Sequence, residues 1–421
     1  MAGASDGDLV AQRLPTSSFL TAGAIDRAST EAALLARFSE GLKGRVQGDR
    51  VLQLEAALRP MVQALPQEAG GGVGHGAARY ALHRFFAREH RWFVKGLTRG
   101  GAPNEWVPSH LQDMLERRLR GSRGLSVHEL AVLAATLEDL VRKESVERLE
   151  ATYKILGVPT SEDIAWSDAE ELIDVYMMVY LRGGNVSTVT SEETRKLMFD
   201  FTKTFPDWST TESWLRKVEG SVATPGDSVG VDATTEVVDA ITQRFGAFND
   251  ATACKGLKAA LMDLEDVEQP GRVRLSAFYK KALAKDSPWA FTEKKEFLRA
   301  LGALDESEPE RPRVILPNYV GSRPQCLEAS GLYAVCCPSE CEDLLGQLEF
   351  AIGTPLAEPS AVARLVAAMR SSTVEAPREL SPSLLRRLEE AAAPHGGKVQ
   401  LHGRLFAQWM HHAYPRECPF P

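Results

Sequence analysis

Apolar residues recur at three- and four-residue spacing over most of the chain, which is the pattern of helices with one buried stripe. Clear examples are residues 49–65 and 78–97, and similar runs follow at 125–144 and 167–183. The strict alternation that is typical of strands is confined to a few residues at a time. The pattern therefore predicts an all-α fold made of several helical domains.

Breaks in this periodicity divide the chain. Gly, Pro, Ser and Asp crowd residues 219–233, and cysteines and prolines become frequent after residue 322. The glycine run at 70–76 lies between two helices rather than after a strand, so it is interpreted as a linker and not as a phosphate loop. The predicted divisions are an N-terminal segment with one amphipathic helix (1–48), a helical domain (49–218), a linker (219–233), a second helical region (234–322) and a Cys-containing helical module (323–421).

Residues 264–283 have the outline of a helix–loop–helix. An amphipathic run ends at an acidic residue, Gly271 allows a sharp turn, and Val273 follows two residues later, before a second amphipathic run. This spacing resembles the EF-hand, whose loops pair through a short β-bridge. Residues 291–320 resemble the partner, with acidic Asp305 and the β-like Val314. We expect Val273 and Val314 to face each other.

Two other stretches resemble the EF-hand less closely. Residues 124–138 look like the second half of such a unit, with Leu125 at the β position and Glu129 four residues later, and residues 146–181 are the expected partner. Near the C-terminus, the pattern of 271–275 returns as Gly-x-Val-x-Leu, at Gly397, Val399 and Leu401. The resemblance covers about half of the chain.

Calcium chemistry does not accompany this shape. A calcium loop supplies about 6–8 oxygens, including a bidentate carboxylate at loop position 12. The first loop keeps Asp266 and Glu268 at positions 1 and 3, and Asp305 opens the second loop, but position 12 of the first loop is Ala277. Arg274 stands at position 9, where a ligand oxygen would be expected. The sequence predicts no bound metal and no cofactor.

The whole chain also resembles a many-membered, uncharacterised family of protein chains from single-celled protists. The stretches that carry this resemblance are PRVILPNYV (312–320), YAVCCPSECEDLLGQLE (333–349) and LHGRLFAQWMHHAYPRECPFP (401–421). The resemblance implies no activity. It implies that related chains continue beyond this C-terminus toward a membrane anchor, so that this chain would be a shorter form.

Five of the six cysteines lie in the last hundred residues, namely Cys326, Cys336, Cys337, Cys341 and Cys418. Such concentration favours disulfides. Two alternatives are free thiols and a zinc site built from Cys337, Cys341, Cys418 and either His411 or His412. Ser339 and Glu342 form the sequence of a capping box, which would place the Cys341 thiol in the first turn of a helix and lower its pKa. The interpretation of Cys341 as a half-cystine is preferred to that of a nucleophile.

Charge, hydropathy and targeting signals bear on which partners and which compartment are expected. The net charge is −8, and basic residues are interspersed with acidic ones, so no nucleic-acid footprint is expected. The chain holds no run long and apolar enough for a membrane span. The absence of a signal-peptide pattern indicates the cytoplasm, whereas the cysteine cluster and the sequon Asn185–Ser187 favour a secretory or surface origin.

No catalytic residue is predicted, because His83, Trp92 and Trp409 lie on helical patterns outside any known catalytic motif. The preferred hypothesis is a non-catalytic helical scaffold that binds a protein partner or a helical peptide through calcium-independent EF-hand-like units. The alternatives are a thiol- or zinc-dependent enzyme centred on the C-terminal cysteines and a calcium-regulated EF-hand protein.

Overall fold

The computed structural model describes residues 48–97, 124–183, 190–205, 207–223, 226, 228–282 and 291–421. The amphipathic helix expected near the N-terminus and the sequon Asn185–Ser187 lie outside these ranges. Helices make up most of the described chain, and its strands are two or three residues long. The prediction of an all-α fold is confirmed. None of the described helices combines the length and apolar character of a membrane span.

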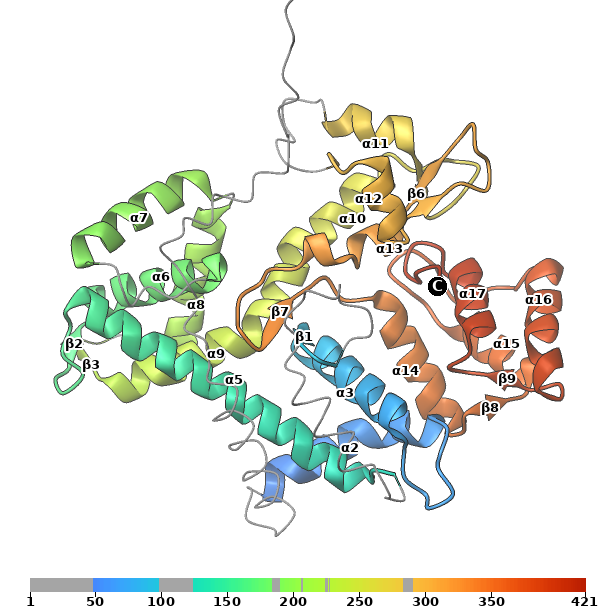
Figure 1. The fold of residues 1–421 in the computed structure, drawn as a ribbon, viewed down its shortest axis with the longest axis horizontal. Helices are drawn as coiled ribbons and strands as arrows, with labels where there is room; N and C mark the ends of the chain where they lie inside the picture. The colour runs from blue at the N-terminus through green and yellow to red at the C-terminus, as the bar shows by residue number, and fades with distance from the viewer. Residues whose placement is uncertain are drawn as a thin grey trace, which may run out of the picture.

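Figure 1 shows the helices arranged in groups around the centre of the molecule. The elements of the first half are α2 (Gly48–Ala64), α3 (His75–Glu89), β1 (Trp92–Val94), α5 (Val127–Leu156), β2 (Ile164–Ala165), α6 (Trp166–Arg182), α7 (Ser191–Thr204), α8 (Trp208–Val222), β3 (Ser228–Val229) and α9 (Val231–Asn249).

The second half begins without a break in the helix, because a π-helical segment, Asp250–Cys254, joins α9 to α10. Its elements are α10 (Lys255–Met262), β4 (Arg272–Arg274), α11 (Leu275–Ala282), α12 (Lys295–Ala300), β5 (Leu304–Asp305), β6 (Arg313–Ile315), α13 (Leu316–Val320), β7 (Tyr333–Val335), α14 (Glu340–Ile352), β8 (Leu356–Ala357), α15 (Pro359–Ala368), α16 (Pro382–Ala392), β9 (Val399–Gln400) and α17 (Arg404–Ala413).

One arrangement recurs along the described chain: two loops, each followed by a helix, meet through a short antiparallel bridge. We call these units 1 (α2, α3 and the start of α5), 2 (α5–α9), 3 (α10–α13) and 4 (α14–α17). The residue pairs at the centres of the four bridges are Val73 with Leu125, Ile164 with Val229, Val273 with Val314, and Ala357 with Val399. Each bridge satisfies backbone groups that two separate loops would leave exposed.

In three of the loops, a glycine in the left-handed region lies two residues before a bridge valine. Gly71, Gly271 and Gly397 have φ values of 84°, 75° and 83°. A residue with a Cβ would be strained at these positions. The Gly-x-Val pattern noted at 271–273 and 397–399 is therefore a structural repeat, and it also occurs at 71–73.

Unit 1 differs from the sequence-based expectation. Leu125 pairs with Val73, inside the glycine run that was interpreted as a linker, and not with a residue of 146–181. The expected partner stretch does contain a loop, but its Ile164 pairs with Val229. The 219–233 stretch consequently includes the end of α8 and all of β3 instead of forming a free linker.

The hydrophobic cores also divide the chain differently from the predicted domains. Units 1 and 2 share one core, which includes α9 residues such as Ile241 and Phe245. Unit 3 has its own core around Phe278 and Val314, and unit 4 has another around Trp409. Helix α9 thus packs with the first half of the chain, although its sequence was assigned to the second helical region.

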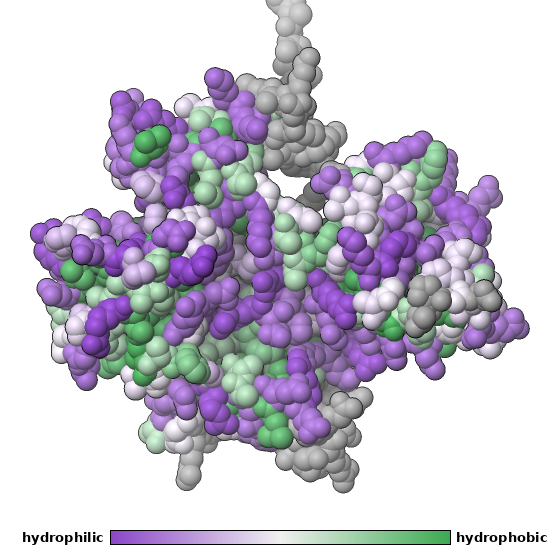
Figure 2. Space-filling model, turned by 180° about the vertical axis from the view of Figure 1, so that it is seen from behind, coloured by the Kyte–Doolittle hydropathy of each residue, from purple (hydrophilic) through white to green (hydrophobic). Residues whose placement is uncertain are grey.

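Unit 4 packs against unit 1. Helix α14 packs against α2 and α3, and β7 pairs with β1, with Trp92 opposite Val335. This contact holds the buried Arg84, whose side chain is 1% exposed and which forms ion pairs with Glu342 and Glu349. On the face seen in Figure 2, hydrophilic residues predominate and apolar residues lie between them in small groups.

Candidate functional site

The loop of unit 3 that resembles a calcium loop holds its first carboxylate in an ion-pair cluster. Asp266 is buried and accepts hydrogen bonds from the guanidinium groups of Arg274, at 2.9 and 3.2 Å, and of Arg313, at 2.9 Å. Hydrogen bonds from Arg274 and Arg313 hold the pKa of Asp266 well below its usual range. The carboxylate is thus ionised, and its oxygens face arginines.

The aspartate of the second loop is also bound by an arginine, which comes from the strand of the first loop. Arg272 of β4 donates to the Asp305 carboxylate at 2.6 Å, while Arg313 of β6 donates to Asp266. Burial alone would raise the pKa of Asp305, but the N–H of Ser307 and the guanidinium of Arg272 lower it on balance. Each strand of the bridge therefore supplies an arginine to the other loop's aspartate.

The register of β4 and β6 explains this exchange. Val273 lies opposite Val314, so both valines point into the core of unit 3, where they are fully buried. Side chains alternate along a strand, so Arg272, Arg274 and Arg313 point away from that core toward the loop carboxylates. Glu268, at loop position 3, has an exposed side chain that lies 3.8 Å from Arg274. The described residues contain no cluster of His, Cys, Asp and Glu suited to a metal ion.

All six cysteines form disulfides. The pairs are Cys254–Cys337, Cys326–Cys336 and Cys341–Cys418. The disulfide interpretation of the C-terminal cysteines is confirmed, and no thiol remains as a nucleophile or zinc ligand in this structure. Cys254 was not among the predicted candidates, because it lies 83 residues before its partner and outside the cysteine-rich segment.

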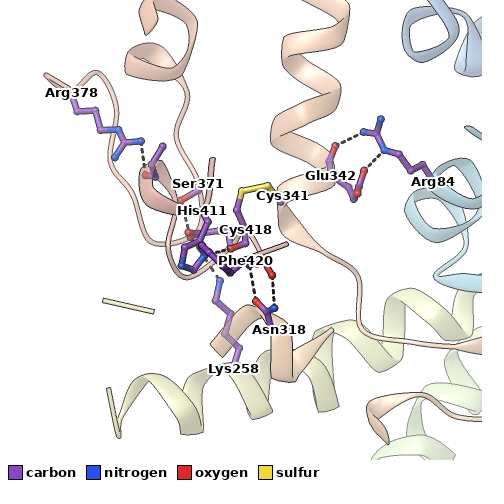
Figure 3. The surroundings of a disulfide bond; sticks show 12 residues. Arg84, Lys258, Asn318, Cys341, Glu342, Ser371, Arg378, His411, Cys418 and Phe420 are labelled. Carbon is purple, nitrogen blue, oxygen red and sulfur yellow. Dashed lines mark hydrogen bonds and ion pairs between the residues drawn. A yellow bond between two sulfur atoms is a disulfide. The ribbon is translucent and has the colours of Figure 1, made fainter. Parts of the chain in front are cut away.

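The C-terminal tail, residues 414–421, crosses from unit 4 to the loops of unit 3 (Figure 3). Cys418 ties it to the first turn of α14, and Asn318 of α13 exchanges two hydrogen bonds with the backbone of Phe420, at 2.7 and 2.8 Å. Arg416 binds both oxygens of Glu265. A Cβ on Gly271 would overlap the carbonyl oxygen of the tail's Pro415.

His411 lies beneath this tail. Burial lowers its pKa to about 4, so the ring is neutral at pH 7, and its Nδ1–H donates to the carbonyl oxygen of Cys418 at 2.7 Å. The ring also contacts Phe420 edge-on. His412 is exposed on the same helix. The proposed zinc ligands are thus divided between two disulfides and a histidine that holds the tail.

The predicted capping box at α14 does not form. Ser339 occupies the N-cap position, but its hydroxyl makes no capping bond. Glu342 turns instead toward Arg84 of α3, which also pairs with Glu349. A buried guanidinium without a carboxylate would be far more costly than an uncapped helix end. Cys341 does lie in the first turn of α14, as expected, and it is a half-cystine.

Other histidines and tryptophans have structural roles. Burial lowers the pKa of His83 to about 4, and its ring packs edge-on against Phe93. Trp92 stacks on His90, and Trp409 donates its indole N–H to the carbonyl oxygen of Leu384. Sequence reasoning missed Arg84 and Arg313, because a buried arginine in an amphipathic pattern looks like a surface one. No family model, curated protein or solved structure matches the chain.

Proposed function

We propose that this protein is a non-catalytic scaffold that binds a protein partner and is built from four EF-hand-like pairs that do not use calcium. One observation carries the proposal: the aspartates that open the two loops of unit 3 are each bound by an arginine from the opposite strand. A guanidinium close to each carboxylate supplies the positive charge that a calcium ion would otherwise bring.

The architecture supports the EF-hand resemblance. Loops of the described units meet through central bridges, and Val273 opposite Val314 is the pairing that an EF-hand pair requires. Ligand positions are filled with residues that carry no suitable oxygen, such as Pro270 and Ala277 in unit 3. The loops thus retain the packing role of the motif, which leaves the helix faces as the surfaces for partners.

The disulfides support a place for the scaffold in an oxidising compartment. Three disulfides persist where thiols are not kept reduced, which favours the secretory or surface origin over the cytoplasm. A thiol- or zinc-dependent activity would require reduction of one of these bonds. The resemblance to the protist family adds no activity to this proposal.

Isothermal titration with a designed basic amphipathic peptide tests the proposal. The peptide should bind with the same Kd in calcium and in chelator, and a scrambled peptide of identical composition should not bind. Binding that needs calcium would promote the calcium-regulated alternative. Failure of the amphipathic peptide to bind under either condition would remove the support for a helix-binding scaffold.

A further inference from the structure

Helix α7 is an addition to unit 2. It lies between α6 and α8 in the chain and contacts α5, α6 and α8, and Figure 1 places it over α6, on the side away from β2 and β3. Its capping box, formed by Thr190 and Glu193, defines a true helix start. Only Thr194 and Phe201 of this helix are buried, and Phe199 is 59% exposed. Helix α7 is therefore lightly docked.

Phe201 is the main anchor of α7. Its ring contacts Trp208 edge-on and stacks on Phe205, while Leu197 and Met198 are partly buried against the same core. These positions follow helical spacing, so one narrow stripe holds the helix. Such an element, with few buried contacts, opens at a lower free energy than the surrounding core.

Units 3 and 4 contain residues at the place that corresponds to α7 and that are held more firmly: Phe291, before α12, and the segment 369–378, between α15 and α16. In unit 4, Met369 is buried, and Arg378 is fixed by bonds to the carbonyl oxygens of Ala367 and Ala413. In unit 3, Phe291 is buried against the rings of Phe278 and Tyr319. Phe291 and Met369 are thus each buried in the core of their own unit. Helix α7 has the same position in unit 2, with a weaker attachment.

The surface under α7 combines apolar and acidic side chains. The apolar part includes Trp208 of α8, which Phe201 contacts edge-on, and helix α6 contributes acidic side chains. Its Glu171 pairs with Arg195 of α7 at 2.8 Å. On the same helix, Glu170 and Asp174 share Arg216 with Glu219 of α8. Glu170 and Glu171 are the more exposed carboxylates of this group, at 39% and 43%, and they favour a basic ligand.

We propose that α7 is an intramolecular occupant of the face formed by α5, α6 and α8, and that a basic amphipathic helix of a partner protein replaces it. The partner's apolar residues take the places of Leu197, Met198 and Phe201, and a basic residue takes that of Arg195. This inference rests on the proposed scaffold function and names its binding face. Only molecules in which α7 has left the face can bind the partner. The apparent Kd is therefore the intrinsic Kd divided by the fraction of molecules in which the face is open.

The probe is a labelled peptide of residues 190–205 in which Glu192→Lys and Asp200→Lys make the helix basic, and its binding to the full chain is followed by fluorescence anisotropy. Phe201→Ala in the chain should loosen α7 and tighten binding of the peptide by about tenfold or more relative to the unmodified chain. The matched control is Phe199→Ala, which removes an exposed ring from the same helix and should leave the affinity unchanged. A peptide that itself carries Phe201→Ala should not bind.

A second variant keeps the test decisive if Phe201→Ala fails to fold. Arg195→Glu repels Glu171 without touching the core and should also increase peptide binding. Adding Glu171→Arg should reverse this increase, because it restores an ion pair within the chain and repels Arg195 of the peptide. A folded Phe201→Ala or Arg195→Glu chain that binds no tighter than the unmodified chain would overturn the inference. If the designed peptide of the previous test still binds such chains, the scaffold function survives with its site elsewhere.

Discussion

Replacing Asp266 by Asn tests whether the loops of unit 3 depend on their ion pairs. The substitution keeps the shape of the side chain and removes its charge, so Arg313 loses its buried partner. The Arg313 side chain is only 3% exposed, and removal of one member of a buried ion pair costs about 3–5 kcal/mol. Arg274 is 45% exposed, so its pair with Asp266 is screened by solvent and contributes little to stability. Because Arg313 keeps a second contact, with Glu308, we expect a loss of about 2–4 kcal/mol.

Hydrogen exchange followed by mass spectrometry measures this loss where it occurs, since a chain with several cores does not unfold in one step. The amides of Leu275 and Leu316 bond to carbonyls across the two loops and report on opening of the bridge. Their exchange should accelerate by roughly 30- to 1,000-fold, since 1.4 kcal/mol corresponds to a factor of ten. The control Arg274→Met should change exchange by less than about fivefold. Equal effects of both variants, or acceleration below about threefold in Asp266→Asn, would refute the assigned role of Arg313.

Four other measurements address the remaining features. Calcium at physiological free levels should leave the melting temperature equal to that in chelator, whereas a site filled at 100 times its Kd would add about 2.7 kcal/mol and a visible shift. Thiol titration of the denatured protein should find no thiols without reductant and six after reduction. Thiols in the sample without reductant would contradict the disulfides. Gly271→Ala should destabilise unit 3 by about 2 kcal/mol or more, measured as faster hydrogen exchange at Leu316, because of its positive φ and the contact with Pro415. The control is Gly256→Ala on the open surface of α10, which should stabilise slightly, by up to about 1 kcal/mol. His83 and His411 have a pKa of about 4 when folded and about 6.5 when unfolded, so the unfolded chain binds more protons between these values, and each histidine contributes a loss of about 1–2 kcal/mol from pH 7 to pH 5. Buried Asp174 and Glu219, with pKa values raised to about 6 and about 7, act in the opposite direction, so the check is the difference between the chains: His83→Phe should lose about 1–2 kcal/mol less than the unmodified chain over this range.

The spacing of apolar residues predicted the helices and placed Val273 opposite Val314, because these features depend on local periodicity and on a loop of fixed length. The same Gly-x-Val pattern is present at Gly71 and Val73. It was interpreted as a linker because the glycine-rich run lies between two helical patterns and does not follow a strand. Its bridge to Leu125 depends on a long-range contact that the local sequence does not encode.

Ionic and covalent partners were harder to predict for a related reason. Arg84, on an amphipathic helix, pairs with Glu349, which lies 265 residues later in the chain. Cys254 is separated from its partner Cys337 by the whole of unit 3. A sequence records the residue types but not which distant segments meet. The reciprocal pairs of Arg272 and Arg313 became evident only once the register of β4 and β6 was known.

Helix α5, which is 30 residues long, begins just after the bridge of unit 1 and ends just before the first loop of unit 2. The continuous helix of α9 and α10 joins units 2 and 3 in the same way. In arrays of repeats, stability is shared between neighbours through such common elements. Any fragment that ends within α5 or α9 would expose an apolar stripe on both sides of the cut. Proteolytic dissection should therefore yield large pieces that contain units 1 and 2 together and never a stable, isolated unit 2.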